Sequence, residues 1–159
     1  MRRSIVILFL LGLMTGCDET RVFEKNVDFQ NRVWMMGHKP EFEFDIQDTT
    51  TQYNIYCSVR NSLSYPYSRL FLTWYLQDSI GKVEQQKLVS KIIFDPKTGR
   101  PEGTSGLGDI YDHRFLLIQK HRFRYSGRHK LKLEQFMRKD TLEGVLAVGV
   151  RIEKATGPN

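Results

Sequence analysis

Cysteine is scarce in this 159-residue chain, which contains only Cys17 and Cys57. The four histidines are His38, His113, His121 and His129. They lack the i, i+4 spacing of a helical metal site, and two isolated cysteines do not have the paired spacing of a zinc site. The sequence therefore predicts no metal site and no small-molecule cofactor.

Long apolar runs are also missing after residue 14. The single run from Ile5 to Met14 is too short to cross a bilayer, which requires about 20 apolar residues. No second run of spanning length follows, and no amphipathic helical repeat of useful length is present. These absences argue against a transmembrane helix and against a helical bundle.

The N-terminal segment carries the most specific signal in the sequence. Arg2 and Arg3 precede the apolar run, and small residues lead into Cys17, which is the pattern of an export signal. The stretch Leu13-Met14-Thr15-Gly16-Cys17 resembles a bacterial lipoprotein lipobox. By that resemblance, residues 1–16 are a signal peptide and Cys17 is the lipidation site, which would carry palmitate or similar acyl chains. The alternative is a plain secretory signal followed by a coincidental cysteine.

The remainder of the chain has the length of one domain. Removal of residues 1–16 leaves 143 residues, enough for one sizeable core. We expect a lipidated N-terminus and polar stalk over residues 17–32, followed by one β domain over residues 33–156. Two or more acyl chains anchor a protein stably, so the lipid alone would hold this domain at a membrane. Once Cys17 is acylated, Cys57 has no disulfide partner, and the core must supply the stability.

The apolar and acidic residues of segment 41–46 alternate strictly, which is the clearest strand pattern in the chain. The alternation places Phe42, Phe44 and Ile46 on a buried face and three carboxylates on a solvated face. Further strands are expected at residues 53–59, 70–77, 83–94 and 145–152. This succession predicts an all-β fold, a single antiparallel β-sandwich with the jelly roll as one candidate topology.

Three of these segments need further interpretation. Residues 110–120 fit either a short helix or a buried strand. Residues 70–77 are apolar on both faces, so Phe71 and Tyr75 mark either a central strand or an exposed aromatic patch. The weak pattern of residues 83–94 favours the edge of a sheet.

Residues 119–139 contain eight basic residues and one acidic residue, the one pronounced charge asymmetry in the chain. A hairpin about Ser126-Gly127 would place four basic residues on one face: Arg122, Arg124, Lys130 and Lys132. Such a face could bind anionic lipid headgroups, lipopolysaccharide phosphates or an acidic protein, and a merely solvated face is the alternative. Nucleic acid is not expected as a partner, because an exported, lipid-tethered domain meets none.

One cluster of chemically versatile residues stands beside the glycine-rich stretch 103–109. Asp109, Asp112 and His113 could hold a cation or transfer a proton. Loop aspartates more often cap turns, and the sequence supplies no recognisable nucleophile, oxyanion hole or third metal ligand. We therefore predict that the protein is not an enzyme.

Several segments together, in this order, carry a family resemblance. They are Trp34, Phe42-Glu43-Phe44, Ile46-Gln47-Asp48-Thr49, Tyr53-Asn54-Ile55-Tyr56, Val59-Arg60-Asn61, Tyr65-Pro66-Tyr67-Ser68, Gly106-Leu107-Gly108-Asp109, Gln135-x-Met137-Arg138 and Val148-Gly149-Val150-Arg151-Ile152-Glu153-Lys154. With the lipobox, this combination resembles the gliding-motility lipoprotein GldH family of Bacteroidota. The resemblance implies a cell-envelope lipoprotein, associated with the machinery for gliding and adhesin secretion, in which only the lipidation of Cys17 transfers residue by residue.

Two functions therefore compete. The first is a non-enzymatic accessory component that docks envelope proteins of the gliding and secretion machinery at a membrane surface. The second is a ligand-binding envelope lipoprotein that grips glycan on a jelly-roll face through Trp34, Trp74 or exposed tyrosines. Neither interpretation fixes which membrane, inner or outer, holds the anchor.

Overall fold

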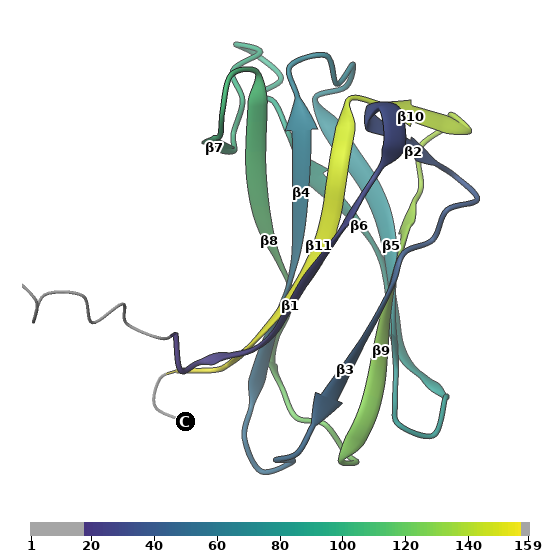
Figure 1. The fold of residues 1–159 in the computed structure, drawn as a ribbon, viewed down its shortest axis with the longest axis vertical. Helices are drawn as coiled ribbons and strands as arrows, with labels where there is room; N and C mark the ends of the chain where they lie inside the picture. The colour runs from purple at the N-terminus through teal and green to yellow at the C-terminus, as the bar shows by residue number, and fades with distance from the viewer. Residues whose placement is uncertain (1–17, 157–159) are drawn as a thin grey trace, which may run out of the picture.

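The computed structural model describes residues 18–156. The elements are β1 (Arg21–Asp28), η1 (Gln30–Arg32), β2 (Val33–Met35), β3 (Glu41–Ile46), β4 (Tyr53–Ser62), β5 (Arg69–Gln77), β6 (Val83–Ile92), β7 (Thr104–Ser105), β8 (Ile110–His121), β9 (Gly127–Gln135), β10 (Thr141–Glu143) and β11 (Val145–Lys154). The strands form two antiparallel sheets packed face to face (Figure 1). The first sheet has the order β1-β11-β4-β8-β7, the second has the order β3-β9-β5-β6, and β10 pairs with β2.

The connections follow the jelly-roll topology. The chain crosses between the sheets from β3 to β4, from β4 to β5, from β6 to β8 and from β8 to β9. The late strands β9 and β11 each insert between two early strands, β9 between β3 and β5, and β11 between β1 and β4. Two interlocked Greek keys of this kind make a jelly roll. The predicted antiparallel β-sandwich is confirmed, in its jelly-roll form.

Alternating side chains of both sheets fill the space between them. β3 buries Phe42, Phe44 and Ile46 and exposes its three carboxylates, as the sequence pattern predicts. Cys57 of β4 points inward, and loss of hydration raises the pKa of its thiol to about 12, so it is an unreactive core residue. In the part of the chain described here, no helix is long and apolar enough to cross a membrane.

The expected stalk needs a correction, because residues 21–28 form β1. This strand pairs with β11 from Arg21 opposite Glu153 to Asp28 opposite Ala147. Phe23 and Val27 pack against the core from the inner face of β1. The segment looks like a stalk in sequence because an edge strand with one covered face needs few apolar residues. The sandwich therefore begins near residue 21 and not at residue 33.

The expected hairpin about Ser126-Gly127 is also wrong. β8 pairs with β4 in the first sheet, whereas β9 pairs with β3 and β5 in the second. The connection crosses the end of the sandwich and buries Phe123 there. Residues 122–125 lie in the connection and form no strand, whereas the alternation after the turn reflects the pairing of β9 with β3 and β5.

The ambiguous segments are resolved as follows. Residues 110–121 form the strand β8, and β6 lies at the edge of the second sheet, as its weak pattern indicates. β5 is central, with a partner on each side, and its outer face still leaves Phe71 38% exposed. Residues 70–77 are therefore a central strand that also exposes an aromatic side chain.

Candidate functional site

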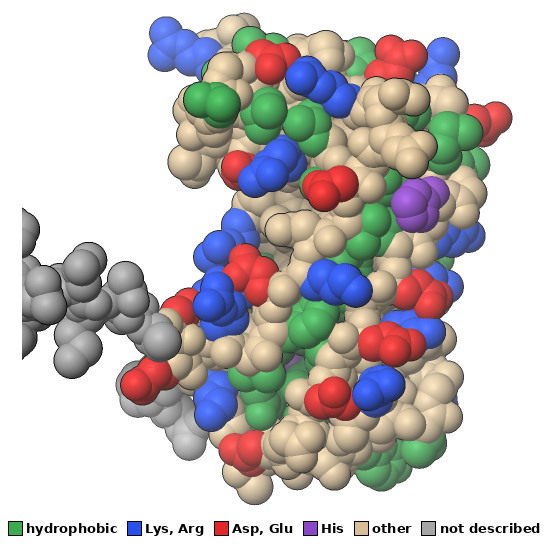
Figure 2. All heavy atoms as spheres, viewed as in Figure 1, with side chains coloured by type: hydrophobic (Ala, Val, Ile, Leu, Met, Phe, Trp, Pro, Cys, Tyr) green, Lys and Arg blue, Asp and Glu red, His purple; other side chains and the backbone are tan. Residues whose placement is uncertain are grey.

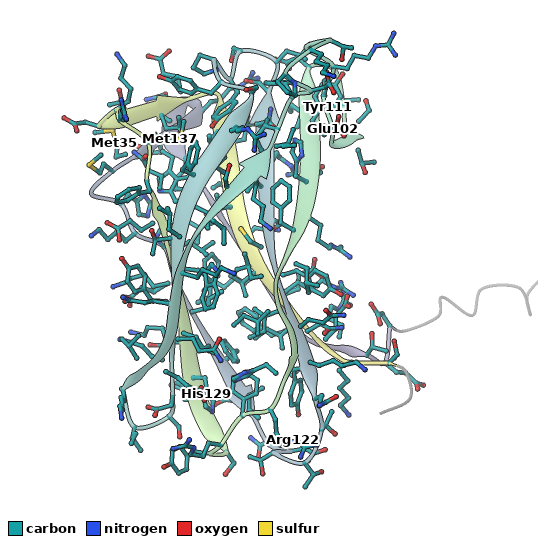
Figure 3. All side chains as sticks on the ribbon, turned by 180° about the vertical axis from the view of Figure 1, so that it is seen from behind. Met35, Glu102, Tyr111, Arg122, His129 and Met137 are labelled. Carbon is teal, nitrogen blue, oxygen red and sulfur yellow. The ribbon has the colours of Figure 1, made fainter. Side chains whose placement is uncertain are left out.

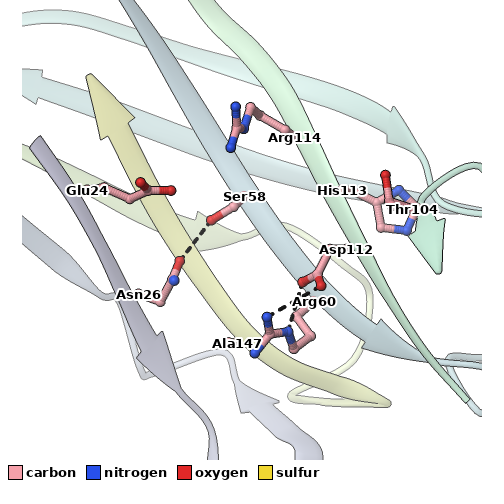
Figure 4. Close-up of a pocket in the computed structure, with 9 residues that line it drawn as sticks. All are labelled: Glu24, Asn26, Ser58, Arg60, Thr104, Asp112, His113, Arg114 and Ala147. Carbon is pink, nitrogen blue, oxygen red and sulfur yellow. Dashed lines mark hydrogen bonds and ion pairs between the residues drawn. The ribbon is translucent and has the colours of Figure 1, made fainter. Parts of the chain in front are cut away.

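A polar hollow lies on the outer face of the first sheet. It has a volume of about 510 Å³ and is lined by Glu24, Asn26, Ser58, Arg60, Thr104, Asp112, His113, Arg114 and Ala147 (Figure 4). β1, β11, β4 and β8 supply its floor, and the β7 loop forms one wall. In the space-filling view the outline of the molecule is indented on this side, with acidic and basic side chains along the hollow (Figure 2).

The register between β4 and β8 sets the charges in this cleft. It places Arg60 opposite Asp112 and Ser58 opposite Arg114. Arg60 Nε donates to Asp112 Oδ1 at 2.8 Å, and its second nitrogen donates to Asp112 Oδ2 at 3.4 Å. The hydrogen bond from Arg60 to the Asp112 carboxylate raises the pKa of the Arg60 guanidinium.

Gly149 of β11 keeps the floor of the cleft open. Ser58 Oγ donates to Asn26 Oδ1 at 2.9 Å across the position where a side chain of residue 149 would stand. A Cβ atom on residue 149 would collide with both of these side chains. β11 runs through Gly149 without interruption, and the glycine makes room for a polar contact.

The candidate cluster Asp109, Asp112 and His113 does not assemble. Asp109 pairs with Arg32 at 3.2 Å, and Asp112 pairs with Arg60. His113 is buried, its ring is stacked on Phe115, and burial lowers its pKa. Residues 18–156 contain no group of three or more His, Cys, Asp or Glu side chains arranged to hold a metal ion. The polar side chains of the cleft can therefore form hydrogen bonds with the polar surface of a binding partner.

The predicted basic face is divided by the jelly-roll crossing. Arg122 and Arg124 lie in the connection between the sheets, whereas Lys130 and Lys132 lie on the outer face of β9. Lys130 Nζ is 2.7 Å from Glu41 Oε2 and 3.5 Å from Glu43 Oε1, and Lys132 Nζ lies over the Tyr75 ring at 4.5 Å. The carboxylates of β3 thus neutralise part of the charge that the sequence assigns to this face.

Both tryptophans proposed as glycan platforms belong to the core. Trp34 is fully buried, donates from Nε1 to the carbonyl of His38 at 2.8 Å and stacks on Phe29. Trp74 is 3% exposed. Neither ring presents a face to solvent, so neither tryptophan supports the glycan-binding alternative.

Two buried histidines meet where the chain crosses between the sheets, which the sequence pattern does not indicate. The rings of His121 and His129 lie 4.5 and 4.6 Å from the ring of Phe123. Burial lowers the pKa of His121, although Glu84 at 3.5 Å opposes that shift. Arg122 and His129 lie at this end of the sandwich, and Met35 and Met137 lie at the other (Figure 3).

The first described residue is held firmly to the sheet. Arg151 lies on the outer face of β11, where its guanidinium contacts the carboxylates of Asp18, Glu24 and Glu153. The Glu24 contact measures 2.7 Å. Hydrogen bonds from Thr20 and Arg151 lower the pKa of the Asp18 carboxyl to about 2. Cys17, the predicted lipidation site, lies outside the described residues.

These observations define a class of protein: a compact jelly-roll domain with a polar cleft and an N-terminal strand that is held to the first sheet. A sequence profile described as GldH lipoprotein matches residues 21–152. The chain belongs to the GldH lipoprotein family, as its sequence resemblance predicts.

Two curated relatives match over nearly the whole chain. The gliding motility lipoprotein GldH homolog of Christiangramia forsetii is 30% identical over 160 residues, covering 94% of this chain and 94% of the relative. The gliding motility lipoprotein GldH of Flavobacterium johnsoniae is 26% identical over 163 residues, covering 96% of this chain and 97% of the relative.

One solved structure shares the fold. It is a family GH115 4-O-methyl-α-glucuronidase, BtGH115A, with a TM-score of 0.51 and 15% sequence identity. The match covers 88% of this chain but only 18% of that much longer chain. A likeness at this identity concerns the β-sandwich alone.

Proposed function

We propose that this protein is a non-enzymatic accessory lipoprotein of the gliding-motility machinery, tethered in the cell envelope and acting by protein docking. The observation that carries the proposal is the family match over residues 21–152, together with the names of two relatives that match over nearly their full length. Arg60 and Asp112 of the cleft are paired with each other, which supports a binding role over a chemical one.

The anchor in this proposal is Cys17, after removal of residues 1–16. β1 begins four residues after Cys17, and Asp18 already contacts Arg151. The acylated residue would therefore attach almost directly to the sandwich, with no stalk between the lipid and the first sheet. One peptide unit spans about 3.8 Å, so the outer face of the first sheet near Arg151 would lie close to the membrane.

Replacement of the predicted lipidation site tests the proposal. The Cys17→Ser variant should fold normally but leave the membrane fraction and fail to restore colony spreading to a strain that lacks the gene. Cys57→Ala removes the other thiol and serves as the matched control, which should stay in the membrane fraction. A Cys17→Ser protein that is soluble and fully active would contradict the role of the anchor.

A further inference from the structure

The outer face of the second sheet carries an apolar groove that neither the cleft nor the anchor explains. Its volume is about 570 Å³, and it is lined by Tyr67, Phe71, Leu88, Phe136, Met137, Arg138 and Lys139. Phe71, Leu88 and Phe136 are 38, 48 and 59% exposed. Large apolar side chains gathered on one exposed surface are typical of an interaction site.

The groove is held in shape by backbone contacts. Phe136 N donates to the Phe71 carbonyl at 2.8 Å, and Phe71 N donates to Met137 Sδ at 3.3 Å. These two bonds fasten the segment after β9 to the edge of β5. The apolar surface is therefore preformed, which lowers the entropic cost of binding.

A buried amide fixes the loop that forms one wall of the groove. Gln135 is 1% exposed, its Oε1 accepts from Met137 N at 2.9 Å, and its Nε2 donates to the Lys139 carbonyl at 2.9 Å. The Gln135 side chain thus bridges the backbone of Met137 and Lys139, and it fixes the segment that contains Phe136 and Arg138. The positions of the exposed Phe136 and Arg138 side chains therefore depend on Gln135, which is itself buried.

The charge around the groove has one sign. Arg138 and Lys139 are exposed, and neither forms an ion pair with any residue in the range 18–156. No carboxylate is among the seven lining residues. The groove is thus complementary to apolar side chains flanked by negative charge.

Two arguments disfavour the other occupants. A second copy would bring Arg138 and Lys139 against their own equivalents across a two-fold axis, which is unfavourable. The described chain begins at Asp18 on the opposite sheet, so a membrane reached through Cys17 would face away from the groove.

We propose that this groove is the docking site for a segment of a protein partner that presents one or two large apolar side chains flanked by carboxylates. The proposal rests on the docking role given above and adds the place and the chemistry of the contact. Apolar contact with Phe71, Leu88 and Phe136 supplies the anchor, and Arg138 and Lys139 select the charge of the partner.

Photocrosslinking on the full-length protein in its native envelope tests this. A photoreactive phenylalanine analogue replaces Phe136, and in the control it replaces Ile80, which is 72% exposed in the turn before β6. Position 136 should yield an adduct with a protein whose crosslinked peptide, sequenced by mass spectrometry, contains large apolar residues next to Asp or Glu. Position 80 should not yield this adduct.

Charge reversal completes the experiment. The double variant Arg138→Glu and Lys139→Glu should reduce the adduct about tenfold or more, since like charges would then face each other. An adduct with lipid, an adduct with a second copy, a crosslinked peptide without carboxylates or no adduct at all would each overturn the inference. Failure of the anchor would show separately, as a Cys17→Ser protein that remains fully active.

Discussion

At the scale of single residues, the surfaces of this domain depend on a few side chains that the strand pattern does not reveal. Gly149 leaves room for the contact between Asn26 and Ser58, and Gln135 positions the loop beside the apolar groove. Both residues sit inside regular strands, where periodicity reports only which face is buried. Their roles come from neighbours that are distant in sequence.

Gly149→Ala should destabilise the domain by about 1–3 kcal/mol, because the new methyl group overpacks the floor of the cleft. Chemical unfolding of the variant and of the parent protein measures the difference. Adding Asn26→Gly or Ser58→Ala removes one of the colliding side chains and should recover part of the loss. Equal stability of Gly149→Ala and the parent protein would show that the floor can rearrange freely.

The buried histidines make stability depend on pH. Burial lowers the pKa of His113 and His121 below the ordinary value of 6.5, with Asp112 and Glu84 opposing the shifts and His129 adding to that of His121. The unfolded chain then binds more protons than the folded chain below about pH 6.5, so folding stability falls as the pH decreases through that value.

This dependence can be measured by urea unfolding at pH 7.5 and at pH 5.5. His113→Asn should reduce the loss of stability between these two conditions. A parent protein that is more stable at pH 5.5 than at pH 7.5 would contradict the assignment.

At the scale of elements, the sequence identifies strands well and their partners poorly. Residues 41–46, 53–59 and 70–77 are found because period-two alternation is a local property. β1 and the crossing from β8 to β9 are missed because pairing in a jelly roll joins segments far apart in the chain. The same limit explains the sites: individual charges are visible in sequence, but the ion pairs of Asp112 with Arg60 and of Lys130 with Glu41 depend on register.

Deletion of residues 19–28 tests whether this segment is a structural strand of the sandwich or a dispensable stalk. Without β1 the buried strand β11 becomes an exposed edge, so the protein should unfold or aggregate. Thermal unfolding and size-exclusion chromatography provide the measurement. Insertion of a Gly-Ser linker between Cys17 and Asp18 is the matched control and should leave the melting temperature unchanged. A deletion variant as stable as the parent protein would restore the stalk interpretation.

At the scale of the whole molecule, the sandwich places the polar cleft and the apolar groove on opposite outer faces. The outer face of the first sheet holds the polar cleft and Asp18, and the outer face of the second holds the apolar groove. The core between them is built mainly from apolar side chains. A domain anchored through Cys17 would thus present the groove away from its own membrane.

The contacts of Arg151 with Asp18, Glu24 and Glu153 have a mechanical consequence. Tension between the anchor and a partner would enter the domain at Asp18, at the end of β1 where Arg21 pairs with Glu153. Ladder hydrogen bonds lie perpendicular to the strands, so a pull along β1 loads them together as shear, and a pull away from the sheet opens them in succession. Arg151 lies beside the strand pairs that would open first. The force that the attachment withstands therefore depends on the direction of pulling.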